Sequence, residues 1–182
     1  MIQAWMIVGA AALALAACGQ SGTPEPTSEA ADAAAGDKTL ATGLGDNQTF
    51  GKAVKAAGLE AVLAGPTPYT LLVPNDAAFA KLPAGALDTL MKPEQRKELT
   101  ALLTHHILAG TILSTDIGKA IDAGGGKTQL PTLGGGTLTA TRAGDRIEIT
   151  DLSGHRAVII AADGQRSNGV IHEVDAVLTP GK

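Results

Sequence analysis

The fold is decided by the C-terminal stretch Ser167-Asn168-Gly169-Val170-Ile171-His172-Glu173-Val174-Asp175-Ala176-Val177-Leu178-Thr179-Pro180. Its first three residues favour a chain reversal, because Asn and Gly adopt positive φ at little cost. Apolar side chains then fall mainly on even positions, with His172 among them, while Ile171 and Val177 make the other face apolar as well. This pattern predicts a strand that is covered on both sides. Such a strand must insert into a sheet whose other strands come from earlier in the chain.

A second stretch, from Tyr69 to Phe79, changes from a strand pattern to a helix pattern at a proline. The β-rich run stops at Pro74, and Asn75 or Asp76 can cap the helix that follows. Proline interrupts a strand ladder, the capping side chain accepts helix N–H groups, and Phe79 can fill the core. The stretch therefore predicts a corner between a strand and a helix.

Helical patterns lie on both sides of this corner. Asp46 or Asn47 can cap a helix that ends at Gly58. Pro93 suits the first position of a further helix, which runs to about Leu103. The first half of the chain is thus mainly helical.

The second half carries strand patterns instead. Short alternating or apolar runs occupy residues 128–133, 137–142, 146–150 and 156–161, and Gly-rich turns divide them. This spacing suggests an antiparallel sheet or sandwich. The glycine triplets at 124–126 and 134–136 are not followed by Lys-Ser/Thr and a helix, which favours plain loops over a phosphate cradle. Helices first and strands mostly last predict an α+β domain.

Three segments together resemble the motifs of the fasciclin family. Their matching positions are Pro74, Asp76 and Phe79 in the first signature, His106 in the middle motif, and Asn168, Gly169, His172 and Asp175 in the second signature. His105 stands where the family usually has Tyr. The resemblance covers residues 39–180 and implies a wedge-shaped β-sandwich with several helices packed over one edge.

The motif residues are interpreted as structural. His106 and His172 are expected to be partly buried imidazoles that hydrogen-bond backbone or carboxylate groups, with Asp76 or Asp175 as candidate partners. In animal members of the family, an Asp-Ile pair after the middle motif has been linked to integrin binding. Asp116-Ile117 matches that pair by position, whereas a helix cap followed by a core residue is the simpler interpretation.

Residues 1–18 resemble a bacterial lipoprotein signal peptide. The uncharged apolar run is shorter than the roughly 20 residues of a membrane-spanning helix, and it ends in Leu15-Ala16-Ala17-Cys18-Gly19. The resemblance implies a lipid anchor at Cys18, and Gly19 after it favours the outer membrane in a Gram-negative host. No Lys or Arg precedes the run, unlike the usual signal. The alternative is a buried helix with an incidental cysteine, although caps and a polar stripe are missing.

Residues 19–38 predict a disordered tether, since they contain Pro, Gly, Ser, Thr and acidic residues but no large apolar side chain. About 20 such residues span roughly 25 Å. They carry a net charge of −3 of the whole chain's −4, which leaves the remaining domain nearly neutral. Without a basic patch, nucleic acid is not an expected partner. The single cysteine excludes an internal disulfide.

Catalysis, metal binding and a cofactor are not predicted. The four histidines include no His-Glu-x-x-His, and adjacent His105 and His106 in an extended segment would point to opposite faces. There is no Gly-x-Ser-x-Gly motif, but Ser114, Ser153 and Ser167 stay open as nucleophiles unless a structure separates them from histidine.

The resemblance implies an adhesion or interaction module without catalytic activity, held in the cell envelope by its lipid anchor. Its expected partners are the membrane and an envelope protein or polysaccharide. The alternative is a binding protein for an apolar small molecule, such as a carotenoid or lipid, which would need an apolar groove. A hydrolase is the third hypothesis.

Overall fold

The computed structural model describes residues 38–46 and 48–181. The expectations for the signal peptide, for residues 19–37 of the tether and for Asn47 as a helix cap lie outside the described residues. Within the described residues, no helix has both the length and the apolar character needed to cross a membrane.

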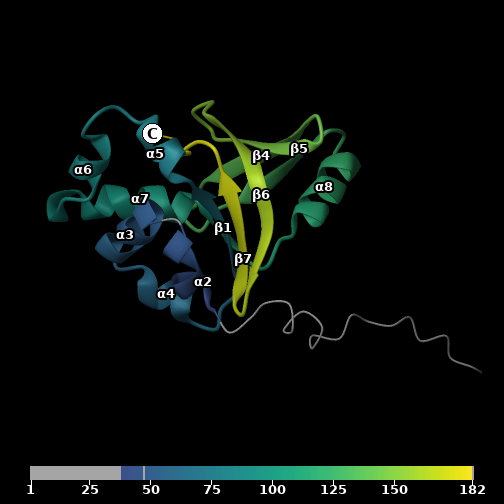
Figure 1. The fold of residues 1–182 in the computed structure, drawn as a ribbon. Coiled ribbons are helices and arrows are strands. Elements are labelled where there is room, and N and C mark those ends of the chain that lie inside the picture. Colours follow the sequence, from purple (N-terminus) through teal and green to yellow (C-terminus); the bar gives the residue numbers. More distant parts are fainter. Residues whose placement is uncertain (1–37, 47, 182) are drawn as a thin grey trace, which may run out of the picture.

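Helices dominate the first half of the described chain (Figure 1). They are α2 (Leu40–Gly43), η1 (Leu44–Asp46), α3 (Gln48–Ala57), α4 (Glu60–Ala64), α5 (Asp76–Ala80), α6 (Ala86–Leu90), η2 (Pro93–Gln95), α7 (Arg96–His105) and α8 (Ser114–Ala123). The strands are β1 (Tyr69–Pro74), β2 (Ile107–Ala109), β3 (Lys127–Pro131), β4 (Thr137–Ala143), β5 (Arg146–Thr150), β6 (Arg156–Arg166) and β7 (Gly169–Val174).

Local sequence accounts for several of these boundaries. Gly58 follows the end of α3 with a φ of 77°, a conformation that favours glycine. The side chain of Asn75 caps α5 by accepting a hydrogen bond from the Ala78 N–H at 2.8 Å. Pro93 opens η2, which leads directly into α7. The predictions at Gly58 and Pro93 are confirmed, and Asn75, not Asp76, is the cap.

The seven strands pair in the order β2-β1-β7-β6-β5-β4-β3. The long strand β6 pairs with β5 on one side and β7 on the other, and its register with β7 shifts between Ile159 and Gly164. The two edge strands of the sheet, β2 and β3, lead close to each other. Leu108 forms an isolated β-bridge with Thr132, and the Leu133 N–H donates to the Ile107 carbonyl at 2.7 Å. The sheet is therefore folded over almost into a barrel.

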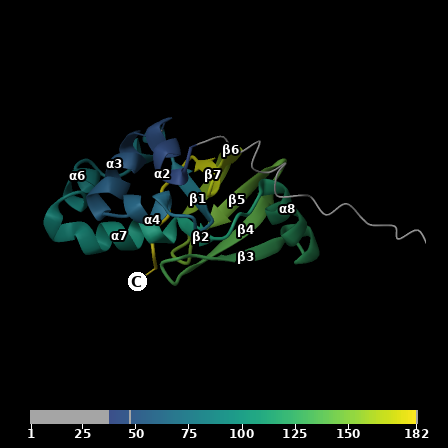
Figure 2. The ribbon, with the colours of Figure 1, turned by 90° about the horizontal axis from the view of Figure 1, so that it is seen from below.

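Two hydrophobic cores lie on opposite faces of the central strands. One core joins α2 to α7 with the outer faces of β1 and β7, and Phe50, Leu71 and Ile171 belong to it. The other fills the folded sheet and includes Leu72 and Val174 from the same two strands. Figure 2 shows α3, α6 and α7 on one side of the sheet and α8 on the other. Strand β7 is thus covered on both sides, as the sequence predicted.

The α+β prediction is confirmed, and strands β3 to β6 pair antiparallel as expected. Two details were not predicted. Strands β1 and β7 are parallel over six residue pairs, from Tyr69 with Gly169 to Pro74 with Val174. Strand β6 runs five residues beyond the predicted 156–161. Each difference depends on long-range pairing or packing that local patterns do not encode.

Candidate interaction groove

The signature residue Asn168 joins three separate segments at the start of β7. Its Oδ1 accepts from the Leu40 N–H at 2.7 Å, and its Nδ2 donates to the carbonyls of Leu63 and Gly65 at 2.8 and 2.6 Å. All of these partners are backbone groups of α2 and of the end of α4. Asn168 therefore satisfies groups at helix ends that have no partner within their own helices.

The two signature histidines are fully buried and bond to backbone groups. The His106 Nδ1–H donates to the Leu102 carbonyl at 2.8 Å, and its Nε2 accepts from the Leu178 N–H at 3.1 Å. In His172 the roles are reversed, since Nε2–H donates to the Ile112 carbonyl and Nδ1 accepts from the Asp163 N–H. Burial lowers the pKa of His106 to about 4, and burial also lowers the pKa of His172. Both imidazoles are therefore neutral at pH 7.

The proposed carboxylate partners of these histidines were wrong. The Asp76 Oδ1 accepts from the Thr49 N–H at 3.3 Å, and the Asp175 Oδ1 accepts from the Val158 N–H at 2.7 Å. Both carboxylates therefore connect backbone segments instead of histidines. The Phe79 side chain is in the helix-side core, as expected for the strand-to-helix corner.

Two further expectations are corrected by α7 and α8. His105 is the last residue of α7 and His106 follows as its C-cap, so the pair is not in an extended segment. Asp116 is the third residue of α8 and does not cap it, because the N-cap position is Leu113. Ile117 is buried with 1% of its surface exposed. Of the Asp-Ile pair, only Asp116 is therefore exposed to solvent.

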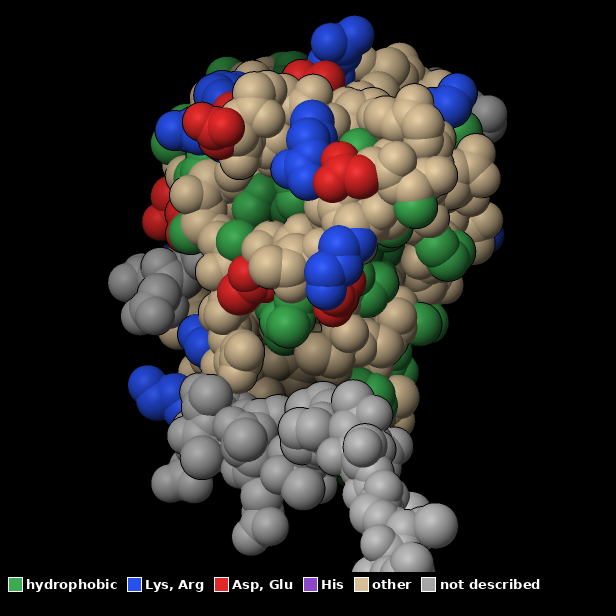
Figure 3. Space-filling model, turned by 90° about the vertical axis from the view of Figure 1, so that its right-hand side faces the viewer, with side chains coloured by type: hydrophobic (Ala, Val, Ile, Leu, Met, Phe, Trp, Pro, Cys, Tyr) green, Lys and Arg blue, Asp and Glu red, His purple; other side chains and the backbone are tan. Residues whose placement is uncertain are grey.

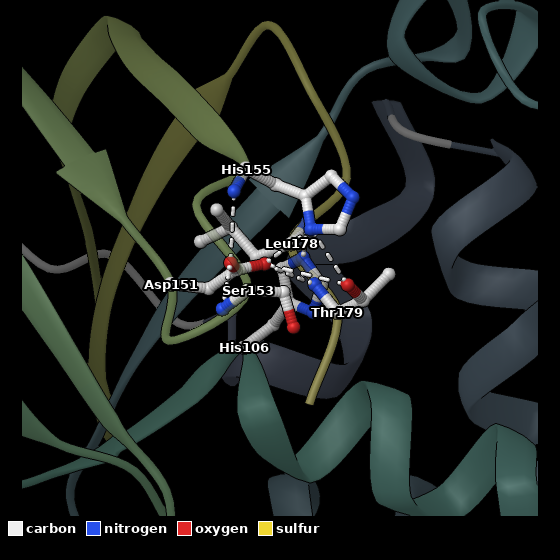
Figure 4. A network of polar contacts seen from close by, with 6 residues as sticks. All are labelled: His106, Asp151, Ser153, His155, Leu178 and Thr179. Atoms are coloured by element: carbon white, nitrogen blue, oxygen red, sulfur yellow. Dashed lines mark hydrogen bonds and ion pairs between the residues drawn. The ribbon is translucent and has the colours of Figure 1, made fainter. Parts of the chain in front are cut away.

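A buried carboxylate, Asp151, ties the C-terminal tail to the β5–β6 turn (Figure 4). It accepts from the backbone N–H groups of Ser153, His155 and Thr179 at 2.8 to 2.9 Å. The His155 Nδ1 lies 3.0 Å from Asp151 Oδ2 and 2.9 Å from Thr179 Oγ1. Although burial opposes the shift, the hydrogen bonds from Thr179 and His155 hold the pKa of Asp151 below its usual range. No sequence motif predicts this network, because its members come from a turn and from the C-terminal tail.

The network contains Thr, His and Asp but lacks the geometry of a catalytic triad. In a triad, the histidine contacts the acid through one ring nitrogen and the nucleophile through the other. Here both Asp151 and Thr179 contact the same atom, Nδ1 of His155. Among the described residues, the Ser114 hydroxyl donates to the Asp163 carboxylate instead of to a histidine, and no group of three His, Cys, Asp or Glu could share a metal ion.

The most promising site for a partner is a surface groove between α8 and strands β4 to β6, with a volume of about 490 Å³. Its floor is aliphatic and includes Ile147, Ile159 and Ile160. Its rim is charged, and the charged residues are Lys119, Asp122, Arg142, Asp145 and Arg146. On this face of the molecule, Figure 3 shows apolar side chains between basic and acidic ones. We call this site the α8 groove.

Both ends of α8 are fixed to the sheet. Near its C-terminal end, Arg142 of β4 makes two hydrogen bonds to the Asp122 carboxylate, at 3.0 and 2.9 Å, and these lower the pKa of Asp122. At its N-terminal end, the Asp163 carboxylate accepts from the Ser114 N–H at 2.7 Å and from the Ser114 hydroxyl. Among the described residues, Asp163 is the only non-glycine with positive φ, at 60°. The register shift in β6 thus presents its carboxylate to α8.

The sequence contained one signal for this groove. Ile159 and Ile160 are adjacent in a strand, so only one of them can face the core. Ile159 is buried in the folded sheet, while Ile160 is 40% exposed. The remaining groove residues come from four elements, and their proximity is visible only in the folded chain.

The fold is thus an α+β domain that carries the α8 groove on its surface. Residues 45–180 match the family model of the fasciclin domain, so this chain belongs to the fasciclin family. Members of this family are generally adhesion or extracellular interaction modules without enzymatic activity.

Two relatives and one solved structure illustrate the range of similarity. The chain is 34% identical to protein sll1483 of Synechocystis over 137 residues, which are 74% of this chain and 69% of that protein. It is 33% identical to cell surface glycolipoprotein MPB83 of Mycobacterium bovis strain BCG over 62% of this chain and 44% of that protein. A FAS1 domain pair of the insect cell adhesion molecule Fasciclin I aligns with a TM-score of 0.69 and 19% identity, over 78% of this chain and 50% of that one. This last likeness concerns the fold alone.

Proposed function

We propose that this chain is an exported, envelope-anchored fasciclin module that holds an envelope partner in the α8 groove and has no catalytic activity. The observation that carries the proposal is the composition of the groove. An aliphatic floor inside a charged rim has the anatomy of a protein interface, in which a desolvated centre is surrounded by polar groups.

The anchoring part of the proposal rests on Cys18 and on the relatives. Cys18 ends the apolar N-terminal run, and MPB83 is a cell surface glycolipoprotein. The described chain begins beside the β6–β7 turn, where the Ser167 N–H donates to the Lys38 carbonyl at 3.1 Å. In Figure 1, α2 and α8 lie on opposite sides of the folded sheet. A chain anchored before Lys38 would therefore leave the α8 groove accessible.

An apolar small molecule is less well supported as the partner. The interior of the folded sheet is filled by packed side chains, and Leu138, Ile149 and Leu178 are fully buried there. A long apolar ligand would therefore have to bind at the surface. The α8 groove has a charged rim, which suits a macromolecular partner better than a carotenoid or a lipid chain.

Photo-cross-linking in intact cells of the native host tests the proposal. A benzophenone amino acid at Thr115, an exposed residue of the groove, inserts into C–H bonds of proteins and of sugars alike. We expect a defined cross-linked product that disappears in the Ile160→Asp variant. Val62→Asp on α4 is the matched control, because Val62 is 41% exposed and Ile160 is 40% exposed. A product that persists in Ile160→Asp would contradict the assignment of the groove.

A further inference from the structure

We infer that the partner in the α8 groove is a protein segment that presents a branched aliphatic side chain next to an acidic one, and that it is not a polysaccharide. This inference rests on the proposed function, because it names the partner class for the same groove.

The groove floor favours an aliphatic side chain. Ile147 and Ile159 lie at its base, and Ile160 and Ala162 extend it to the surface. An aliphatic side chain placed against these residues removes apolar surface from water, which is favourable in proportion to the area removed. The branched hydrocarbons of Val, Ile or Leu match such a floor in chemistry.

A sugar chain does not match this floor. Sugar rings carry hydroxyl groups around their edges, and burying these groups against isoleucine would leave hydrogen bonds unmade. Their more apolar faces are accommodated by flat aromatic side chains. In the described part of the chain the aromatic residues are Phe50, Tyr69 and Phe79, and all three pack in or against the helix-side core, away from the groove.

The rim favours an acidic neighbour for that aliphatic side chain. Asp122 is occupied by Arg142, and Lys119 lies 3.9 Å from Asp116. Arg146 and Asp145 also line the groove, and neither makes an ion pair with any described residue. Of the basic groups, Arg146 is thus the one left to pair with a partner carboxylate, and a guanidinium suits this role through paired hydrogen bonds.

The groove is also preorganised. Asp163 holds the first residue of α8, and the Asp163 N–H donates to the buried His172 at 3.2 Å. Arg142 holds the other end of α8 through Asp122. A groove whose walls are fixed in the free protein binds without an additional cost of ordering them.

The test is a selection from a displayed library of random heptapeptides on the full chain in detergent. We expect selected peptides to pair Asp or Glu with Val, Ile or Leu. Their binding, followed by fluorescence anisotropy of synthetic peptides, should weaken at least tenfold in Ile160→Asp and should be unchanged in Val62→Asp. Arg146→Glu should reverse the charge preference, so that peptides with Lys in place of the acid bind better than the originals.

An acidic oligosaccharide, oligogalacturonate, serves as the competing probe. Peptides without the acidic and aliphatic bias, or an Arg146→Glu variant with unchanged preference, would overturn the inference. Binding of oligogalacturonate that Ile160→Asp abolishes would also overturn it, yet would leave the proposed function intact. The proposed function itself would be contradicted if cross-linking from Thr115 in cells gave no product, or gave a product that Ile160→Asp left unchanged. Since Ile160 and Arg146 lie at the surface, unchanged melting of both variants is the check on folding.

Discussion

At the scale of single residues, the buried polar side chains of the fasciclin signatures serve the backbone. Asn168, His106 and His172 together bond to backbone groups of seven other residues, in α2, at the end of α4, in α7, in the irregular part of β6 and in loops. Buried N–H and carbonyl groups without partners are costly, and these groups are beyond the reach of a regular ladder. Most of these bonds therefore hold together segments that the sheet itself does not connect.

Replacing His172 with Ala should destabilise the domain strongly. The change leaves the Ile112 carbonyl and the Asp163 N–H without partners and opens a cavity, for an expected loss of about 2–4 kcal/mol. Urea denaturation of the wild type and variant measures the loss. His155→Ala is the comparison, because its side chain is 55% exposed, and equal losses in the two variants would contradict this view of His172.

The low pKa of His106 predicts that stability falls as the solution is acidified from pH 6.5 towards pH 4. Between these values a histidine in the unfolded chain takes up a proton, whereas folded His106 stays neutral until about pH 4. Acid therefore favours the unfolded state, by about 3 kcal/mol at the lower end of this window, and the effect is absent above pH 6.5. Burial also lowers the pKa of His105 and of His172, so both residues add to this loss of stability in acid.

Urea midpoints measured between pH 7 and pH 5 test this dependence before most carboxylates titrate. The His106→Gln variant has no titrating group at this position, so its stability should fall less steeply over the same range. A variant with the slope of the wild type would show that His106 does not contribute.

At the scale of elements, the parallel pairing of β1 with β7 controls the architecture. The last strand enters between β1 and β6, so the sheet cannot form until nearly the whole chain is available. The Asn168-Gly169 pair starts this strand, and Gly169 has a φ of 151° opposite Tyr69. A Cβ atom at Gly169 would collide with the Tyr69 carbonyl oxygen. Glycine is required here by the close approach of two backbones.

Gly169→Ala should therefore disrupt the β1–β7 pairing, with a loss of several kcal/mol or a failure to fold. Gly45→Ala is a suitable control, since a Cβ at Gly45 would meet no atom within 4 Å and Gly45 does not have positive φ. Thermal melting of both variants, followed by circular dichroism, measures the difference. A Gly169→Ala variant as stable as Gly45→Ala would refute the role of this close approach.

At the scale of the whole molecule, the two cores are joined through β1 and β7, and the C-terminal tail closes the assembly. Leu178 packs inside the folded sheet while its N–H donates to His106, and Thr179 bonds to Asp151. The start of the described chain is fixed at the other end of β7 through Asn168. Both ends of the described chain are thus attached to the folded domain by hydrogen bonds.

The proposed anchor predicts that Cys18→Ser releases the protein from membranes. In this proposal the Cys18 thiol is the site of lipid attachment, and the domain itself is nearly neutral and has no other expected membrane affinity. Fractionation of native-host cells into membrane and soluble fractions, followed by immunoblotting, measures the release. Variant protein that stays with the membrane at the wild-type level would contradict lipidation at Cys18.

Sequence alone determined the features that depend on local chemistry. The two apolar faces of residues 170–174, the break at Pro74 and the helix end at Gly58 follow from side-chain periodicity and from the φ preferences of Pro and Gly, which act within a few residues. Together with the order of the three fasciclin motifs, these features were enough to predict an α+β fasciclin fold.

Only the tertiary structure decided which distant groups meet. Asn168 bonds to Leu40 across 128 positions, Arg142 pairs with Asp122 across 20, and His106 bonds to Leu178 across 72. No local pattern relates such residues. Their proximity results from the folding of the sheet and from the insertion of β7 between β1 and β6. For the same physical reason the α8 groove, assembled from one helix and three strands, exists only in the folded chain.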